Sequence, residues 1–383
     1  MSGSDQTWMR WALELAMRGR GAVEPNPMVG CIVVKDGRII GRGYHRAFGQ
    51  AHAEPAALAA CDTSPRGATA YVTMEPCCHA GKKTPPCVPA LASAQVARVV
   101  VGCADPNPQV AGQGIAQLRQ AGVEVGDFVL QAPCRQLNAA YFARMEQGRP
   151  YVTLKWAQTA DGRIAAAGGG RLQITQPASQ RIVHQLRARC EAILVGIGTV
   201  LNDDPSLTAR TRGPSRSRLR IVIDRNLATP PASRLLATAR DVPVLIYCSQ
   251  RAVADNPAGA AALRNLGAEL AIADEASGHL DLRWILADLG GRDVTHLLVE
   301  PGPSLAGAFL QRGLADRLWV FGSTMRVGDP SAPGAPAVEY PRTASLELDG
   351  DALWEHLNPQ SAVYFAPEPS ADFVLARSER QGA

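Results

Sequence analysis

The sequence has few aromatic residues, little net charge and no long apolar run. Phe, Trp and Tyr make up only 5% of its 383 residues, which leaves few side chains on which single-stranded bases could stack. The net charge of +4 at pH 7 is too small to predict nucleic-acid binding. No stretch approaches the roughly 18 consecutive apolar residues of a membrane span, and Asp5 and Glu14 interrupt the apolar residues where a signal peptide would need an unbroken run. We therefore expect a cytoplasmic protein that binds neither nucleic acid nor membrane.

The nine cysteines do not indicate a disulfide framework, because no secretory signal accompanies them. Scattered cysteines are most often small buried hydrophobic residues, and six are expected to be of this kind: Cys31, Cys61, Cys103, Cys134, Cys190 and Cys248. The other three, Cys77, Cys78 and Cys87, fall within eleven residues of one another. This cluster needs a separate explanation.

Length and periodicity predict two α/β domains. Domains of roughly 100–200 residues favour two units, and a hydrophobic content of 46% with 19% charged residues supplies a large core and argues against a disordered chain. In the first half, strands are expected at 29–34, 39–43, 70–74, 96–101 and 123–125, and helices at 5–18, 51–60, 88–94 and 114–120. In the second half, strands are expected at 151–155, 192–195, 219–223, 244–247, 296–299 and 317–321, and helices at 179–189, 260–266, 284–289 and 304–311. Gly148 and Pro150 interrupt both the helical and the strand periodicity of hydrophobic residues, so the predicted domains are 1–147 and 148–383.

Residues of the first half predict a catalytic zinc site. Such a site needs three protein ligands and leaves one position for water. His52 opens a predicted helix with Glu54 two residues on, Cys77 follows a predicted strand, and Cys87 precedes the next helix. Zinc deaminases bind the metal with one His and two Cys, and a Glu that is not a ligand carries protons. We predict His52, Cys77 and Cys87 as zinc ligands and Glu54 as the catalytic proton carrier.

Cys78 and His79 are alternative ligands. Otherwise Cys78 is expected to be a buried thiol and His79 a loop residue near the substrate. A structural or RNA-binding zinc module would have a closed site with four protein ligands, and His79 is the candidate for the fourth. That arrangement would leave Glu54 without a role.

Five segments of the first half resemble one known family: Pro25–Gly30, Gly43–His45, His52–Glu54, Glu75–His79 and Thr84–Cys87. It is the family of bifunctional riboflavin-biosynthesis deaminase/reductases, in which a cytidine-deaminase-like domain is fused to a dihydrofolate-reductase-like domain. Most zinc deaminases close the site with Cys-x-x-Cys, so the longer loop that ends in Thr-Pro-Pro-Cys is distinctive of this branch. The resemblance covers residues 5–370 approximately and implies a three-layer α/β sandwich followed by a reductase-like α/β domain.

The loop between the two cysteines departs from the family pattern. We expect eight residues between them, and nine lie between Cys77 and Cys87, with Lys82-Lys83 as the apparent insertion. Either the loop accommodates the extra residue and Cys77 remains the ligand, or Cys78 is the ligand in its place. We favour Cys77 because it directly follows Glu75-Pro76.

The resemblance also implies the reductase residues and the substrate contacts. Segments 155–163, 196–200 and 202–210 match the family closely, and 299–305 resembles its Val-Glu-Gly-Gly turn, where a helix N-terminus can meet phosphates. The implied cofactor contacts are Ala157, Gln173, Thr199, Asp203, Arg225, Gly302, Pro303 and Ser304. The implied substrate contacts are Asn26, His45, Arg171, Arg187, Leu207, Arg210 and Glu300.

For three of these residues the sequence also allows a structural interpretation. Asn26 lies between two prolines and could be a turn residue, and Arg187 could lie on a solvated helix face. Arg210 begins a basic stretch that continues through Arg212, Arg216, Arg218 and Arg220. Without interleaved aromatics, we interpret this stretch as a solvated loop rather than a nucleic-acid site. As substrate contacts, the arginines suit a phosphate.

Four positions of the second half depart from the family pattern. Arg171 and Gln173 stand where Ser and Trp are expected, Arg225 replaces a Ser, and Pro301 replaces the first Gly of the turn. Proline lacks an N–H and fixes φ, so cofactor affinity is expected to be altered there.

The resemblance implies a two-step enzyme of riboflavin biosynthesis. With Zn²⁺ it would hydrolytically deaminate 2,5-diamino-6-ribosylamino-4(3H)-pyrimidinone 5′-phosphate. With NADPH it would then reduce the ribosyl side chain to give 5-amino-6-(5-phosphoribitylamino)uracil. The alternative is a zinc deaminase whose reductase-like domain has lost or changed its activity. The expected partners are the phosphorylated pyrimidine and further copies of the chain in a homo-oligomer.

Overall fold

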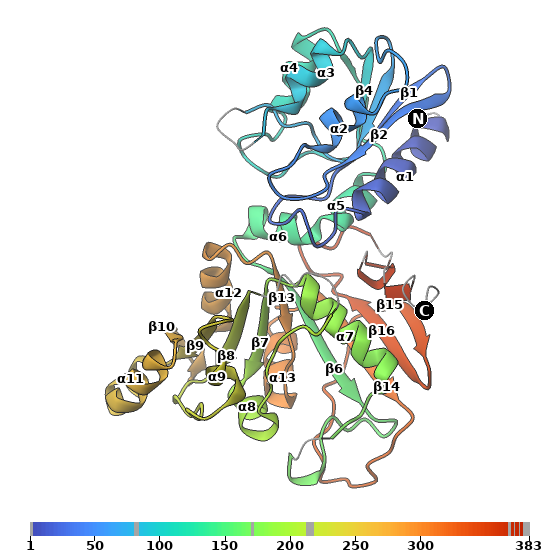
Figure 1. The fold of residues 1–383 in the computed structure, drawn as a ribbon. Coiled ribbons are helices and arrows are strands. Elements are labelled where there is room, and N and C mark those ends of the chain that lie inside the picture. Colours follow the sequence, from blue (N-terminus) through green and yellow to red (C-terminus); the bar gives the residue numbers. More distant parts are fainter. Residues whose placement is uncertain are drawn as a thin grey trace. The chain divides into compact units, whose positions relative to one another are not determined.

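The computed structural model describes residues 3–79, 84–169, 172–211, 218–366, 369–370, 372–374 and 376–377. Arg171, Arg212, Arg216 and the Lys82–Lys83 insertion lie outside the described residues. The chain forms two compact units, Met1–Gln147 and Gly148–Ala383 (Figure 1). Among the described helices, none is long and apolar enough to cross a membrane.

The first unit is built on a five-stranded sheet in the order β2-β1-β3-β4-β5. Its strands are β1 (Gly30–Lys35), β2 (Arg38–Tyr44), β3 (Thr69–Val72), β4 (Arg98–Val101) and β5 (Glu124–Val125). Strand β1 pairs antiparallel with β2 and β3, whereas β3, β4 and β5 are parallel. Asp36 and Gly37 join β1 to β2 with positive φ values of 50° and 72°. A two-residue hairpin loop of type I′ requires positive φ at both of its central residues.

Helices cover both faces of this sheet. On one face, Ala57, Leu91 and Leu118 from three helices share a core with the strands. On the other face, Tyr71 of β3 donates its hydroxyl to Asp5 of the first helix at 2.8 Å. The helices are α1 (Gly3–Met17), α2 (Ala53–Ala59), α3 (Cys87–Ser93), α4 (Gln113–Gln120), α5 (Gln131–Leu137) and α6 (Ala139–Gln147). The predicted three-layer α/β sandwich is confirmed, and α5 and α6 are additional elements that the sequence did not predict.

The second unit is built on a nine-stranded sheet in the order β10-β9-β8-β7-β13-β6-β14-β16-β15. Seven neighbouring strands, from β10 to β14, are parallel, and β16 and β15 continue the sheet antiparallel (Figure 1). The strands are β6 (Tyr151–Gln158), β7 (Ala192–Gly196), β8 (Leu219–Ile223), β9 (Val244–Cys248), β10 (Ala268–Ile272), β13 (His296–Val299), β14 (Arg317–Ser323), β15 (Arg342–Leu348) and β16 (Asp351–Leu357). A separate hairpin consists of β11 (Glu275–Ala276) and β12 (His279–Leu280).

Helices also cover both faces of the large sheet, which gives the predicted α/β class. Leu186, Leu235 and Leu263 belong to the core on one face, and Ile285 and Phe309 to the core on the other. The helices are α7 (Pro177–Arg189), α8 (Ile197–Asp203), α9 (Arg234–Ala237), α10 (Gln250–Asp255), α11 (Pro257–Asn265), α12 (Leu282–Gly291) and α13 (Pro303–Gln311), with the short 3₁₀ helix η1 (Ala167–Gly169).

Arg220 is not part of a solvated loop, so that interpretation is wrong for this residue. It lies in β8 and is fully buried. Its guanidinium donates to the carbonyls of Ser206, Thr238 and Val242 and to the Thr238 hydroxyl, at 3.1, 3.0, 2.5 and 2.8 Å. A buried guanidinium needs such acceptors, and residues of neighbouring loops supply them.

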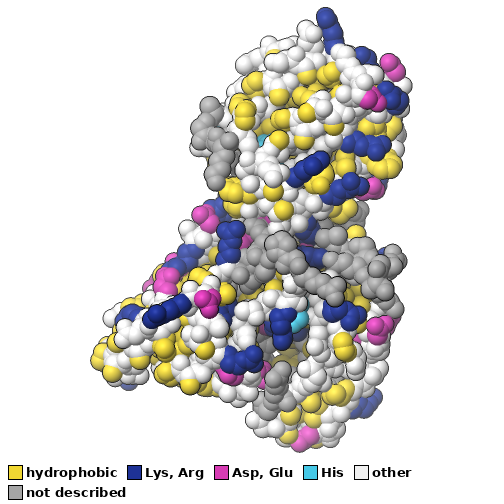
Figure 2. All heavy atoms as spheres, viewed as in Figure 1, with side chains coloured by type: hydrophobic (Ala, Val, Ile, Leu, Met, Phe, Trp, Pro, Cys, Tyr) yellow, Lys and Arg dark blue, Asp and Glu magenta, His cyan; other side chains and the backbone are white. Residues whose placement is uncertain are grey.

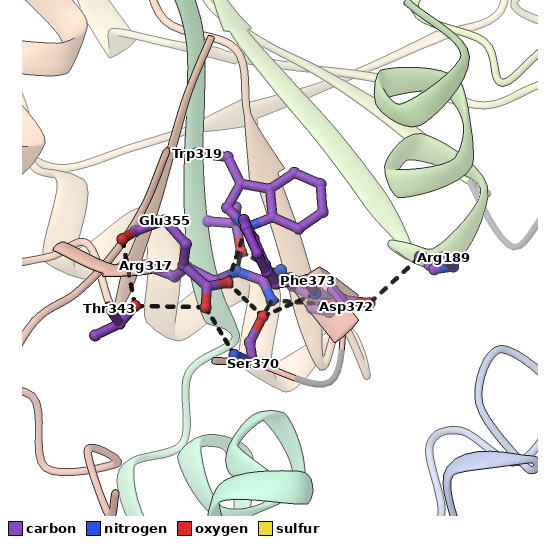
Figure 3. A network of polar contacts seen from close by, with 10 residues as sticks. Arg189, Arg317, Trp319, Thr343, Glu355, Ser370, Asp372 and Phe373 are labelled. Carbon is purple, nitrogen blue, oxygen red and sulfur yellow. Dashed lines mark hydrogen bonds and ion pairs between the residues drawn. The ribbon is translucent and has the colours of Figure 1, made fainter. Parts of the chain in front are cut away.

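The end of the chain is tied to the sheet by a buried polar network. Arg317 of β14 donates to Asp372 at 2.7 Å and to the Ser370 hydroxyl at 2.9 Å (Figure 3). Glu355 of β16 accepts from the Ser370 backbone at 2.7 Å and from the Trp319 indole at 2.9 Å. These bonds compensate the three charges of Arg317, Asp372 and Glu355, which are withdrawn from water.

None of the nine cysteines is joined in a disulfide in the structure. Five of the six scattered cysteines are buried, and Cys61 is half-buried. Cys78 is also half-buried rather than buried, with its thiol 3.9 Å from the Gln109 carbonyl.

Candidate active sites

Three potential metal ligands meet in the first unit. Nδ1 of His52 lies 3.5 Å from Sγ of Cys77 and 3.4 Å from Sγ of Cys87, and the two sulfurs are 3.4 Å apart. His52 is the residue before α2, Cys77 follows the end of β3, and Cys87 is the first residue of α3. The Cys87 N–H also donates to the Cys77 carbonyl at 2.9 Å. Local backbone structure therefore brings together donors that are 35 residues apart in sequence.

The donor set fits a zinc ion. Tetrahedral zinc with bonds of about 2.3 Å to sulfur and 2.0–2.1 Å to nitrogen would set its donors about 3.6–3.8 Å apart, close to the separations of 3.4–3.5 Å here. The hydrogen bond with Cys77 and burial both raise the pKa of the Cys87 thiol. Two adjacent thiolates in this buried place therefore need a cation to compensate them. In the described part of the chain, this is the one group of three or more such donors.

The carboxyl of Glu54 is buried beside this group. It lies in the first turn of α2, and its exposed fraction is 3%. Burial, reinforced by the nearby Cys77, raises the pKa of Glu54 to about 7. A carboxyl that titrates near neutral pH can both accept and donate a proton.

Two residues predicted to contact the substrate, Asn26 and His45, are connected to each other. Nδ2 of Asn26 lies 3.2 Å from Nε2 of His45, and Nδ1 of His45 lies 3.1 Å from the Ala51 carbonyl. Because that carbonyl can only accept, Nδ1 carries the proton and Nε2 accepts from Asn26. The His45 ring also meets the His52 ring edge-on, with centroids 5.1 Å apart. The structure thus places His45 beside the metal donor His52 and Asn26 beside His45.

The alternative ligands lie apart from this group. The three donors that meet are His52, Cys77 and Cys87, and neither Cys78 nor His79 is among them in the described residues. Glu75, two residues before Cys77, anchors the chain there. Its buried carboxylate accepts the N–H groups of Gly112 and Ile115 at 3.0 and 3.1 Å.

A cavity of ≈ 1380 Å³ opens in the second unit. It lies where β6, β7, β8 and β13 end, and the carboxyl ends of parallel strands are where α/β folds bind their ligands. Figure 2 shows Lys and Arg side chains, with a histidine among them, gathered on one face of this unit. All the predicted cofactor residues line the cavity: Ala157, Gln173, Thr199, Asp203, Arg225, Gly302, Pro303 and Ser304. Four of the predicted substrate residues line it as well: Arg187, Leu207, Arg210 and Glu300.

Charged residues concentrate on one side of the cavity. Arg187 donates to Glu300 through both Nε and Nη2 at 2.6 Å. Burial alone would raise the pKa of Glu300, but Arg187 and Lys155 lower it to about 2. Arg187 is thus neither exposed nor on a solvated helix face.

Lys155 is a residue that sequence analysis did not assign. It lines the cavity from β6, and burial lowers the pKa of its ammonium group despite the opposing effect of Glu300. The only signal in the sequence was a single lysine inside an otherwise apolar strand, from Tyr151 to Ala157.

The turn before α13 lines the cavity at the N-terminus of that helix. Gly302 is the N-cap of α13 and Pro303 is its first residue. Proline is tolerated there because its missing N–H would have no helical partner. Pro301 is buried and precedes this helix end, so it removes no N–H from α13 itself.

Comparison with known proteins agrees with both sites. Residues 2–103 match the cytidine and deoxycytidylate deaminase zinc-binding region, and residues 150–350 match the RibD C-terminal domain. Riboflavin biosynthesis protein RibD of Escherichia coli is 42% identical over 329 residues, which are 83% of this chain and 87% of that one. The protein of the same name from Aquifex aeolicus is 39% identical, over 85% and 90% of the two chains.

Solved structures give the same result. Acinetobacter baumannii RibD, form 1, superposes with a TM-score of 0.81 at 35% identity, over 93% of this chain and 99% of that one. A Thermotoga maritima protein described as a diaminohydroxyphosphoribosylaminopyrimidine deaminase/5-amino-6-(5-phosphoribosylamino)uracil reductase superposes with a TM-score of 0.77 at 33% identity, over 93% and 99%.

Fold and sites together define a bifunctional enzyme with a zinc-binding deaminase domain and an NADPH-dependent reductase domain. The chain belongs to the RibD family of riboflavin biosynthesis proteins. The predicted family is thereby confirmed, and a deaminase with a decayed reductase domain is not favoured, because residues 150–350 match the RibD C-terminal domain.

Proposed function

We propose that the two sites act in sequence on one pyrimidine. The first removes an amino group from 2,5-diamino-6-ribosylamino-4(3H)-pyrimidinone 5′-phosphate, and the second reduces the ribosyl chain to give 5-amino-6-(5-phosphoribitylamino)uracil. The observation that carries the proposal is the meeting of His52, Cys77 and Cys87 beside the buried carboxyl of Glu54. The Thermotoga maritima relative is named for the same two activities.

In the first domain, His52, Cys77 and Cys87 would hold the zinc ion. When bound, zinc would lower the pKa of a water molecule, so that the water can give up a proton as it attacks the carbon that bears the amino group. Glu54 takes a proton from the attacking water and delivers it to the departing nitrogen, so that the C–N bond breaks and ammonia leaves. The raised pKa of Glu54, about 7, supports both transfers.

Asn26 and His45 would orient the pyrimidine. His45 is fixed by the Ala51 carbonyl and accepts one N–H of the Asn26 amide. That bond sets the direction of the amide, whose oxygen can then accept an N–H from the substrate ring. The pair thereby favours a ring with a donor at this position.

In the second domain, Arg210 would bind the substrate phosphate, Arg187, Leu207 and Glu300 would contact other parts of the substrate, and Arg171 is the further family contact. NADPH supplies a hydride to C1 of the opened ribosyl chain. The reduction also needs a proton on the neighbouring heteroatom, and we assign its delivery to Lys155. Burial lowers the pKa of this ammonium group, which makes it a better acid.

The cofactor would lie along Ala157, Gln173, Thr199, Asp203 and the turn Gly302–Ser304. Its phosphates suit the N-terminus of α13. Asp224 at the end of β8 is not available to a ribose hydroxyl, because its carboxylate already accepts from Ala228 and Thr229. Arg225 follows it on the cavity wall, where its Nε donates to Glu275 at 2.5 Å, and its other guanidinium N–H groups would contact the 2′-phosphate that distinguishes NADPH from NADH.

The ligand set is tested by comparing Cys77→Ser with Cys78→Ser. Cys77→Ser removes a thiolate that would bind zinc, so bound zinc should fall sharply. Cys78→Ser is the matched control on the neighbouring residue and should keep one zinc per chain. Zinc is measured by atomic absorption on the purified full-length proteins, and the reverse pattern would move the ligand to Cys78.

We further propose that the enzyme is cytoplasmic and forms homo-oligomers. Nine free thiols support a reducing compartment. Light scattering of the purified chain gives its oligomeric state, and a monomer at all concentrations would contradict the second proposal.

A further inference from the structure

The ring of His52 is held from the side opposite the two thiols. Its Nδ1 faces Cys77 and Cys87, whereas its Nε2 lies 3.0 Å from the hydroxyl oxygen of Thr84. A histidine that binds metal through Nδ1 carries its proton on Nε2, and that N–H needs an acceptor. The Thr84 hydroxyl is placed to be this acceptor.

Thr84 belongs to the same short segment as one of the thiol ligands. Pro85 and Pro86 follow it, and their fixed φ angles limit the conformations of the chain up to Cys87. The segment is anchored beyond the prolines, because the N–H groups of Cys87 and Val88 both donate to the Cys77 carbonyl, at 2.9 and 3.2 Å. One stiff segment therefore carries a ligand and also contacts a second ligand.

We propose that Thr84 is a positioning residue for the metal centre. It accepts the Nε2 proton of His52, and it thereby fixes both the tautomer and the orientation in which Nδ1 points at the metal. This inference rests on the proposed ligand set and extends it by one residue that does not itself bind the ion.

The position of Thr84 also accounts for how the site accommodates the longer loop. The extra residue of this chain lies before Thr84, between Cys77 and the Thr-Pro-Pro-Cys segment. The spacing from Thr84 to Cys87 is therefore unchanged, and the contacts of both residues with His52 are kept.

The test is zinc affinity, measured on the full-length protein by competition with a chromophoric chelator. Thr84→Val keeps the shape of the side chain but removes the acceptor, and we expect zinc binding to weaken by about 10–100-fold, as for other residues that orient metal ligands. Thr84→Ser restores the hydroxyl and should bind zinc like the wild type. Thr63→Val is the matched control, because Thr63 is exposed in the loop after α2.

A second measurement separates positioning from folding and from substrate binding. With Co²⁺ in place of zinc, the visible absorption bands report the geometry of the ligands, and Thr84→Val should shift them while Thr84→Ser should not. If Thr84→Val binds zinc as tightly as the wild type, Thr84 has no positioning role, whatever happens to its KM for the pyrimidine. If the wild type binds no zinc, the proposed ligand set is wrong, and the inference about Thr84, which rests on it, is wrong as well.

Discussion

Arg187 and Glu300 form a two-point ion pair inside the cavity of the second unit, with both N–O distances at 2.6 Å. Arg187 belongs to α7, and Glu300 is the residue after β13. Each side chain is only 15% exposed. Because both charges are largely withdrawn from water, each one is stabilised chiefly by its partner.

Glu300→Gln should therefore destabilise the second unit and abolish reduction. The change leaves the guanidinium of Arg187 without its carboxylate, and removing one partner of a buried pair costs about 3–5 kcal/mol. We expect the lower end of that range, since the amide can still accept one hydrogen bond. Urea unfolding and NADPH oxidation measure the two effects, and ammonia release should be unchanged. Glu347→Gln, at an exposed carboxylate of β15, is the control; equal behaviour of the two variants would contradict the prediction.

The same pair predicts a dependence of stability on acid. The pKa of Glu300 is about 2 in the fold, against an ordinary value of 4.5. A carboxyl with a lowered pKa stabilises the fold above its unfolded pKa, and this contribution is lost as the pH falls from about 4.5 toward about 2. Thermal unfolding midpoints across this range should fall more steeply for the wild type than for Glu300→Gln. Parallel curves for the two proteins would show that Glu300 makes no such contribution.

Local sequence patterns were enough to identify the candidate zinc donors. His52 and Glu54 are two residues apart at a helix start, and Cys87 opens the next helix after two prolines. Such junctions depend on turn chemistry and on periodicity, both of which are visible in the sequence. Most central strands were predicted for the same reason: β8 and β13 are short segments rich in Leu, Ile and Val, and their bounds match.

Other features depended on contacts between distant residues. Arg220 looked like one of several loop arginines, but its guanidinium is satisfied by carbonyls up to 22 residues away. Strands β15 and β16 carry alternating polar residues and pair antiparallel at the sheet edge, where the apolar signal is weak. Lys155 could not be assigned because its environment is created by Arg187 and Glu300 from other elements.

Glu54→Gln should keep one zinc per chain and lose deamination by several orders of magnitude. The amide is close in size to the carboxylate and is not expected to bind the metal, but it cannot carry a proton. Zinc content and ammonia release on the purified variant measure the two properties. Turnover close to that of the wild type would remove Glu54 from the proposed role.

The buried network at the chain end predicts a stability effect that leaves the first unit untouched. Asp372→Asn takes the negative charge from the 2.7 Å ion pair with Arg317, which is 2% exposed (Figure 3). We expect a loss of about 3 kcal/mol in the unfolding free energy of the second unit. Arg317→Met combined with Asp372→Asn should cost less than the sum of the single changes, because the double change removes both charges of the pair, whereas each single change leaves one of them buried without its partner. Strict additivity in urea unfolding would contradict this account.

The central claim is that one chain deaminates and then reduces the same pyrimidine, and stoichiometry tests it most directly. Bound zinc, ammonia released and NADPH oxidised are measured together on the full-length protein with the diaminopyrimidinone phosphate. We predict one zinc per chain and one NADPH oxidised for each ammonia released. One zinc with ammonia release but no loss of NADPH would contradict the account, and it would direct attention to the departures at Arg171 and Pro301.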